Sequence, residues 1–153
     1  ALGRNYFISL MNKKAAAIGL SHSTFVDPAG FGVGNSSTAE DLFTLLKYLS
    51  ENRRFVLDIT AGTLARDAYG DVQFKQLQNF NAFPGMENDF FGGKIGKTEA
   101  AKETYAGIYG LNVSGEKRKI AVIVLGATDV QKSVEELLGY LNTFYAAEPP
   151  AQE

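Results

Sequence analysis

Lys97 and Thr98 are the residues whose types and spacing most directly suggest chemistry. They lie in the stretch GGKIGKTEAAKETYAG (92–107), between a glycine-rich run and Glu99. A lysine ammonium beside a threonine hydroxyl on an extended strand can hold a carboxylate, because one supplies positive charge and the other a hydrogen-bond donor. The same two residues can equally be ordinary surface residues of a solvent-exposed strand. The rest of the chain has to distinguish these interpretations.

Composition narrows the classes of function. The 153 residues are enough for about one domain, and 15 Lys+Arg against 17 Asp+Glu give a net charge of −2 without a basic run. A nucleic-acid or anionic-membrane surface is therefore not indicated. With no cysteine and one histidine, we expect no disulfide, no cysteine nucleophile, no metal site and no cofactor. No stretch approaches the roughly 18 apolar residues of a membrane span, and the first residues do not resemble a signal peptide.

Three stretches predict helices by the spacing of their apolar residues. Residues 2–18 form the first, with Gly19 as its C-cap and one face in the core. Ser37 is expected to cap the second through the capping-box pattern of residues 37–40, and Thr128 with Gln131 resembles another capping box before a final helix. The buried stripes of these two helices are Leu42, Leu45, Leu46 and Leu49, and Val134, Leu137, Leu138, Leu141 and Phe144.

Irregular and extended segments separate these helices. Residues 23–37 are rich in glycine and are expected to form an ordered loop, with Asp27 as a turn former and His22 as a surface or helix-capping residue before it. Residues 55–80 alternate in polarity and predict extended segments, arranged as a hairpin off the main sheet.

The carboxy-terminal third predicts two strands of a sheet. Residues 105–113 form one strand, residues 114–117 a turn, and the β-branched run 120–125 a central strand that ends at Gly126-Ala127. The fold class is therefore α+β, with helices packed on an antiparallel sheet and a carboxy-terminal helix. We expect one domain over residues 1–146 and a disordered tail over 147–153.

Five segments, in this order, resemble one protein family. They are FISLMNKKAAAIGL (7–20), STFVDPAGF (23–31), STAEDLFTLLKYL (37–49), QNFNAF (78–83) followed by GGKIGKT (92–98), and IAVIVLGATDVQKSVEELLGYL (120–141). Together they resemble the serine-type D-alanyl-D-alanine carboxypeptidases, penicillin-binding proteins of the peptidase S11 type with a β-lactamase-like fold. The resemblance covers nearly the whole chain and implies a partial version of that fold.

The resemblance implies what the chain would do. The family cleaves peptidoglycan stem peptides through an acyl-enzyme and binds β-lactams, which implies an extracytoplasmic location. Its Lys-Thr-Gly strand binds substrate, which implies substrate-binding roles for Lys97, Thr98 and Glu99. Gly96, Asn79 and Asn81 would support that strand.

Two departures from the family pattern limit this inference. The family's Ser-x-x-Lys and Ser-x-Asn motifs are not in their expected places, and the formal matches at 114–117 and 50–52 fall in a predicted turn and at a helix end. No catalytic residue is therefore assigned, and the chain alone is expected to be inactive. Glu99 replaces the family's glycine, and residues 97–107 contain an apparent two-residue insertion. A catalytically inactive relative that binds cell-wall peptide or a protein partner is the alternative, and a complementary fragment or second copy of the chain is a possible partner.

Overall fold

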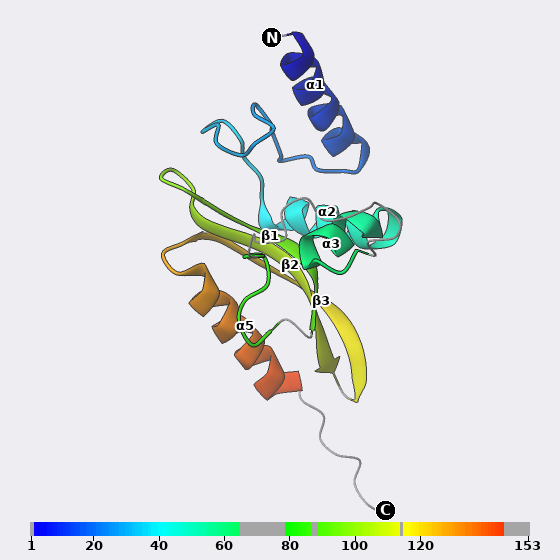
Figure 1. Cartoon of the computed structure of the whole chain (residues 1–153), viewed down its shortest axis with the longest axis vertical. Helices are drawn as coiled ribbons and strands as arrows, with labels where there is room; N and C mark the ends of the chain where they lie inside the picture. Colours follow the sequence, from blue (N-terminus) through cyan, green and yellow to red (C-terminus); the bar gives the residue numbers. More distant parts are fainter. Residues whose placement is uncertain (1, 65–78, 87–88, 114, 146–153) are drawn as a thin grey trace, which may run out of the picture.

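The computed structural model describes residues 2–64, 79–86, 89–113 and 115–145. Their helices and strands are α1 (Leu2–Ala17), α2 (Ala39–Asn52), α3 (Arg54–Ala61), β1 (Phe90–Thr98), β2 (Lys102–Val113), β3 (Glu116–Ala127) and α5 (Val130–Tyr145). The strands form an antiparallel sheet in the order β1-β2-β3. Figure 1 shows α2 and α3 on one face of this sheet and α5 on the other. The predicted α+β class, with a carboxy-terminal helix on an antiparallel sheet, is confirmed.

Each face of the sheet has its own apolar core. On the α5 face, Tyr105 and Tyr109 of β2 pack with Val130 and Val134. On the opposite face, Leu46 of α2 and Leu57 of α3 enclose Ile108. Burial of these side chains from two sides makes β2 the central strand among the described residues.

The second helix begins one residue later than predicted. Thr38, not Ser37, is the N-cap of α2, because its Oγ1 accepts a hydrogen bond from the backbone N–H of Asp41 at 3.2 Å. Ser37 instead contacts the hydroxyl of Ser23 at 2.8 Å. The same displacement occurs at α5, where Asp129 rather than Thr128 accepts the backbone N–H of Lys132 at 2.9 Å. Both helices thus have side-chain caps on their free backbone N–H groups.

The prediction of extended structure from residue 55 is wrong for its first part, which is helix α3. Arg54 and Asp58 are one helical turn apart and form an ion pair, with 3.5 Å between Nε of Arg54 and Oδ1 of Asp58. Gly62 ends the helix in the left-handed conformation, with φ 75°. Leu57 is turned into the core, whereas Phe55 and Ile59 are exposed. The alternation of polarity was therefore too short to distinguish a strand from an amphipathic helix. The rest of the predicted hairpin, from residue 65 to 78, lies outside the described residues, as does the predicted tail.

β2 and β3 both form, but each begins earlier than predicted: β2 begins at Lys102 rather than at residue 105, and β3 begins at Glu116, within the predicted turn, rather than at residue 120. β3 also differs in its position and its end. It continues through Gly126 and Ala127, which were expected to break it, and it lies at the edge of the described sheet rather than in its centre. Leu125 is 46% exposed. β-branched residues suit any pleated surface with one covered face, so their run does not by itself place a strand centrally.

Helix α1 forms as predicted, but much of its expected core face is exposed, and Ala15 near its end is the buried member. Tyr6 and Phe7 are 65% and 54% exposed, and Figure 1 shows the helix standing apart from the sheet. The helix is attached to the following loop and to α2. The side-chain amide of Asn12 donates to the carbonyl of Phe25 and accepts the backbone N–H of the same residue, and the ammonium of Lys14 lies over the ring of Tyr48. Periodicity identified the helix correctly, although it does not show what covers the apolar face.

The loop after α1 is ordered by side-chain hydrogen bonds, as expected. Asp27 accepts the backbone N–H groups of Phe31 and Gly32 and pairs with Arg4 at 3.3 Å. His22 is exposed, and its backbone N–H donates to the buried carboxylate of Asp41 at 2.8 Å. None of the described helices has both the length and the apolarity needed to cross a membrane.

Candidate functional site

The candidate site is the end of the β1–β2 hairpin, where Lys97 and Thr98 complete β1 as predicted. Lys97 lies opposite Glu103 and Thr98 opposite Lys102, so residues 99–101 form the turn. Lys102 has φ 58°, a left-handed conformation that is unfavourable for a side chain with a Cβ. Residues 99–101 and the left-handed Lys102 thus form the hairpin tip beyond the end of the strand that carries Lys97.

Lys97 is held in an ion pair across the hairpin. Its Nζ lies 2.6 Å from Oε1 of Glu103, while Oε2 of Glu103 accepts the backbone N–H of Val130 at 2.9 Å. The Lys97 side chain is 76% exposed and that of Glu103 is 18% exposed. The carboxylate is therefore the fixed partner, because both of its oxygens are engaged and it is largely covered.

The pKa values of both groups follow from this contact. The hydrogen bond from Lys97 lowers the pKa of Glu103, and the backbone N–H of Val130 lowers it further. The same hydrogen bond raises the pKa of Lys97. Both groups are therefore charged at neutral pH, and the positive charge of Lys97 is compensated within the protein.

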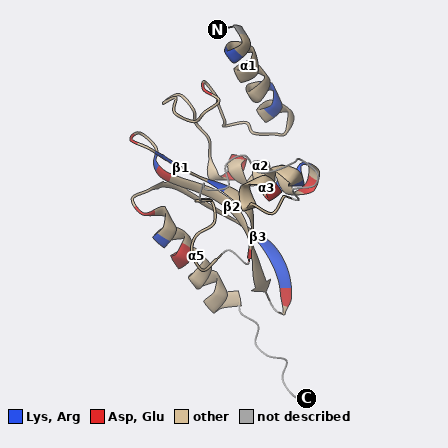
Figure 2. Ribbon diagram, viewed as in Figure 1, with Lys and Arg blue, Asp and Glu red and all other residues tan. Residues whose placement is uncertain are grey.

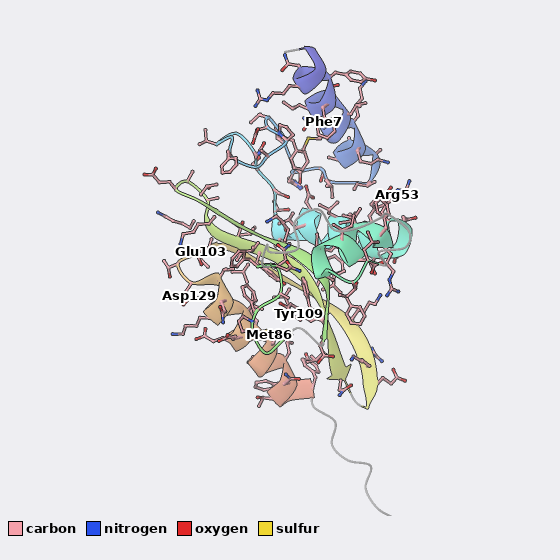
Figure 3. All side chains as sticks on the ribbon, in the orientation of Figure 1. Phe7, Arg53, Met86, Glu103, Tyr109 and Asp129 are labelled. Atoms are coloured by element: carbon pink, nitrogen blue, oxygen red, sulfur yellow. The ribbon has the colours of Figure 1, made fainter. Side chains whose placement is uncertain are left out.

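A pocket of about 670 Å³ lies beside this ion pair. Its walls come from β1, from the segment between residues 79 and 84, and from the start of α5. Lys97, Glu103 and Asp129 provide its charged lining, and Phe80, Phe83 and Ile95 much of its apolar lining. Figure 3 shows Glu103 and Asp129 close to each other where α5 begins, and Figure 2 shows charges of both signs near this end of the hairpin.

Thr98 and Glu99 are directed to the loop side of the hairpin. The Thr98 Oγ1 accepts the backbone N–H of Ala101 at 3.0 Å, which stabilises the turn. Thr98 and Lys97 both border a hollow of about 530 Å³ near Phe31. Thr98 and Glu99 border a neighbouring hollow of about 590 Å³. Glu99 is exposed in the turn and does not line the pocket beside Glu103.

Of the predicted supporting residues, Asn81 directly contacts the edge of β1 that faces away from β2. Oδ1 of Asn81 accepts the backbone N–H of Ile95 at 3.2 Å, and the hydroxyl of Thr60 accepts that of Gly93 at 3.0 Å. Asn79 donates to the carbonyl of Thr60 at 2.9 Å. Gly96 has little room for a side chain, because a Cβ there would lie 3.1 Å from the Thr104 hydroxyl. Asn81 is thus bonded directly to β1, whereas Asn79 is connected to it through Thr60.

Among the described residues, the outer edge of β1 has an unpaired position at Lys97. Backbone groups of alternate residues in an antiparallel strand point to the same edge, so Lys97 follows Gly93 and Ile95 in facing away from β2. The N–H groups of Gly93 and Ile95 are bonded as described above, whereas the N–H of Lys97 has no partner within the described ranges. An extended peptide can pair with such an edge.

Two buried tyrosines support Asn81, the residue that is hydrogen-bonded to this edge. The hydroxyl of Tyr105 donates to the carbonyl of Asn81 at 3.1 Å and lies 2.8 Å from the hydroxyl of Tyr109. Because the Tyr105 proton is used on Asn81, Tyr109 is the donor in the second contact. Burial raises the pKa of both hydroxyls, so they stay protonated and act as structural supports.

Glu103 is the site residue that sequence reasoning missed. The signal was present in the spacing, since Lys97 and Glu103 stand at symmetrical distances from the three turn residues 99–101 and so face each other in any hairpin closed there. Across the described residues, no cluster of three acidic or histidine side chains is suited to a metal ion.

Comparison with known proteins identifies related chains. The family model described as D-alanyl-D-alanine carboxypeptidase (peptidase S11) matches residues 1–129. A D-alanyl-D-alanine endopeptidase of Pseudomonas aeruginosa is 46% identical over 44 residues, and one of Escherichia coli K12 is 48% identical over 44 residues; each alignment covers 29% of this chain and 14% of the relative.

Two solved structures from Mycobacterium tuberculosis are similar to the whole fold. A D-alanyl-D-alanine carboxypeptidase superposes with a TM-score of 0.61 at 26% identity, covering 95% of this chain and 55% of that protein. An evolved penicillin-binding protein homolog superposes with a TM-score of 0.56 at 27% identity, covering 98% and 57%. The chain thus spans little more than half the length of these two proteins.

Proposed function

This chain belongs to the D-alanyl-D-alanine carboxypeptidase family (peptidase S11), and we propose that it forms the substrate-side wall of a D-alanyl-D-alanine peptidase acting on peptidoglycan stem peptides. The similar proteins include a carboxypeptidase and two endopeptidases, so the proposal is made at the level of the D-alanyl-D-alanine peptidase. Family enzymes of this kind work on the cell wall, and we place the protein outside the cytoplasm on that basis.

The open backbone edge of β1 at Lys97 is the observation that carries this proposal. A substrate peptide in extended form would pair with this edge beyond Ile95, and the 670 Å³ pocket would receive one of its side chains. The Asn81 and Thr60 contacts keep the neighbouring positions of the edge occupied. Pairing is thereby confined to the end of the strand near Lys97.

The reaction of the proposed enzyme is acyl transfer. A serine hydroxyl attacks the carbonyl of the penultimate D-alanine, the following residue leaves with its amine protonated, and water then hydrolyses the acyl-enzyme. We assign neither the serine nor its base to this chain. Lys117, the lysine of the formal Ser-x-x-Lys match, is paired with Asp89 at 2.6 Å and is not placed to accept a proton.

Covalent labelling and peptide binding test this function. Fluorescent penicillin should label the longest natural form of the protein, and a D-Ala-D-Ala peptide should bind the 153-residue chain weakly without being cleaved. Absence of a penicillin adduct on the longest form would remove the enzymatic proposal. Absence of peptide binding to this chain would remove the assignment of the wall.

An inactive binding protein is the second candidate, favoured by the ion pair that neutralises Lys97. Such a protein would bind cell-wall peptide or another protein, and β-lactams would not label its longest form.

The exposed apolar residues of α1 and the edge position of β3 also suit a complementary fragment or a second copy of the chain. Light scattering after size-exclusion chromatography tests this partner, and a monomer at all concentrations would argue against it.

A further inference from the structure

Glu103 occupies the position at Lys97 that a ligand carboxylate would need. Lys97 and Glu103 are a directly opposed pair whose backbone groups point away from each other, the arrangement in which cross-strand side chains come closest. Their charged atoms are 2.6 Å apart. The ion pair therefore follows from the register of the hairpin.

The carboxylate of Glu103 is harder to displace than the ammonium of Lys97. It is covered by the start of α5 and is bonded there to the Val130 N–H at 2.9 Å. An incoming ligand would find Lys97 exposed but accompanied by a fixed negative charge. Asp129 adds a second carboxylate to the lining of the same pocket, so these three groups together carry a net negative charge.

A free carboxyl terminus would be disfavoured at this place. Two carboxylates that share one ammonium repel each other, and the ligand would also have to give up its hydration. An amide at the same position carries no charge and can donate to Glu103 as well as accept from Lys97. A peptide that continues past this point, or one with a capped terminus, presents such an amide.

We propose that Glu103 is a specificity-determining residue that makes this wall select peptides with a neutral amide, rather than a terminal carboxylate, beside Lys97. The inference rests on the proposed function and specifies its substrate class: peptides recognised at an internal position of the chain.

Two probe peptides test this selection. Diacetyl-L-Lys-D-Ala-D-Ala is prepared as the free acid and as the carboxy-terminal amide, and both are titrated into the 153-residue protein by calorimetry. The wild-type protein should bind the amide at least as tightly as the acid. Glu103→Gln keeps the shape of the side chain and removes its charge, so it should shift the ratio of acid to amide affinity toward the acid by about threefold to tenfold.

Two further variants serve as controls. Glu116→Gln removes a carboxylate from the distant start of β3, where Glu116 pairs with Arg118, and should leave the ratio unchanged. Lys97→Met in the Glu103→Gln background should abolish the gain for the acid. Circular dichroism melts verify that each variant is folded.

The outcomes separate the inference from the function beneath it. Binding of both peptides with the same ratio in wild type and Glu103→Gln would overturn the role of Glu103 while leaving the wall intact. A wild-type preference for the acid would overturn it as well. If neither peptide binds any variant, the proposed wall is refuted and the inference with it.

Discussion

Gly92 provides a quantitative test of how the edge of β1 is built. Its φ is 126°, and a Cβ at this position would lie 2.5 Å from the carbonyl oxygen and 2.8 Å from the Cα of Leu57. Both atoms belong to the backbone of α3 and cannot move aside like the end of a side chain. Alanine at position 92 would therefore meet both backbone strain and a collision that shifts α3 away from the sheet.

The cost of Gly92→Ala follows from these two effects. A non-glycine residue in a rarely populated conformation costs about 1–3 kcal/mol, and forced displacement of a packed element adds about 1–3 kcal/mol. Together they predict a loss of roughly 2–6 kcal/mol from a total stability of about 5–15 kcal/mol. For a chain of this length the melting temperature should fall by roughly 4–24 °C.

Urea unfolding followed by circular dichroism measures this loss, with Gly139→Ala as the matched control. Gly139 lies within α5, and a Cβ there would meet nothing within 4 Å, so alanine should stabilise the helix by about 0.5–1 kcal/mol. If Gly92→Ala unfolds within about 0.5 kcal/mol of wild type while the control behaves as expected, α3 does not pack on β1 in this way. The hydrogen bond from the backbone N–H of Gly93 to the hydroxyl of Thr60, which depends on this packing, would then be refuted as well.

Three further predictions concern the residues around the site. Lys102→Gly should stabilise the protein by about 0.5–1 kcal/mol in the same urea assay, because glycine relieves the left-handed conformation at φ 58°; a destabilised variant would contradict the described turn. Tyr105→Phe should cost about 1–3 kcal/mol, since it leaves the Asn81 carbonyl and the Tyr109 hydroxyl without their partner, and a cost as small as that of an exposed Tyr140→Phe would refute the buried network. Lowering the pH should break the Lys97–Glu103 pair only below the pH at which an ordinary glutamate is protonated, because the pKa of Glu103 is lowered in the folded protein. The stabilising contribution of the pair is present above the pKa that Glu103 has in the unfolded chain. It is lost as the pH falls through the pKa that Glu103 has in the folded protein. Carboxyl carbon chemical shifts of Glu103 record this titration, and an ordinary or raised pKa would contradict it.

The helices and strands that the sequence predicts correctly are those with long patterns. Sixteen-residue α1 and α5 contain about four turns each, so their apolar spacing is unambiguous, and β2 is long enough to show its extended character. The eight residues of α3 are too few, and Thr60, whose β-branched type favours a strand, lies in the last turn of that helix, where its hydroxyl donates to the carbonyl of Leu57 at 2.9 Å.

The errors about burial have a different cause. Apolar spacing in α1 and β-branched residues in β3 show that a face is suited to burial, whereas burial itself depends on which elements lie beside it in space. Tyr6 and Leu125 are exposed for this reason despite their favourable patterns. Long-range placement of this kind is not encoded in local periodicity.

The candidate site was partly accessible from the sequence. The strand position of Lys97 and Thr98 and the proximity of Asn81 to that strand were predicted and are seen in the structure. The partner of Lys97 was not, because Glu103 becomes its neighbour only once the turn at residues 99–101 is fixed. Glu99, which was considered from the sequence, lies in that turn, and Glu103 is the glutamate opposite Lys97.

Chemical-shift mapping tests the central claim most directly. The 153-residue protein is labelled with nitrogen-15 and titrated with the free-acid and amide forms of the D-Ala-D-Ala peptide. The account predicts that binding shifts the backbone amide of Lys97 most strongly, together with those of Glu103 and Val130, while amides of β3 stay unchanged. Shifts that avoid the outer edge of β1, or that gather on β3 or α1 instead, would contradict the assignment of this strand as the peptide-binding wall.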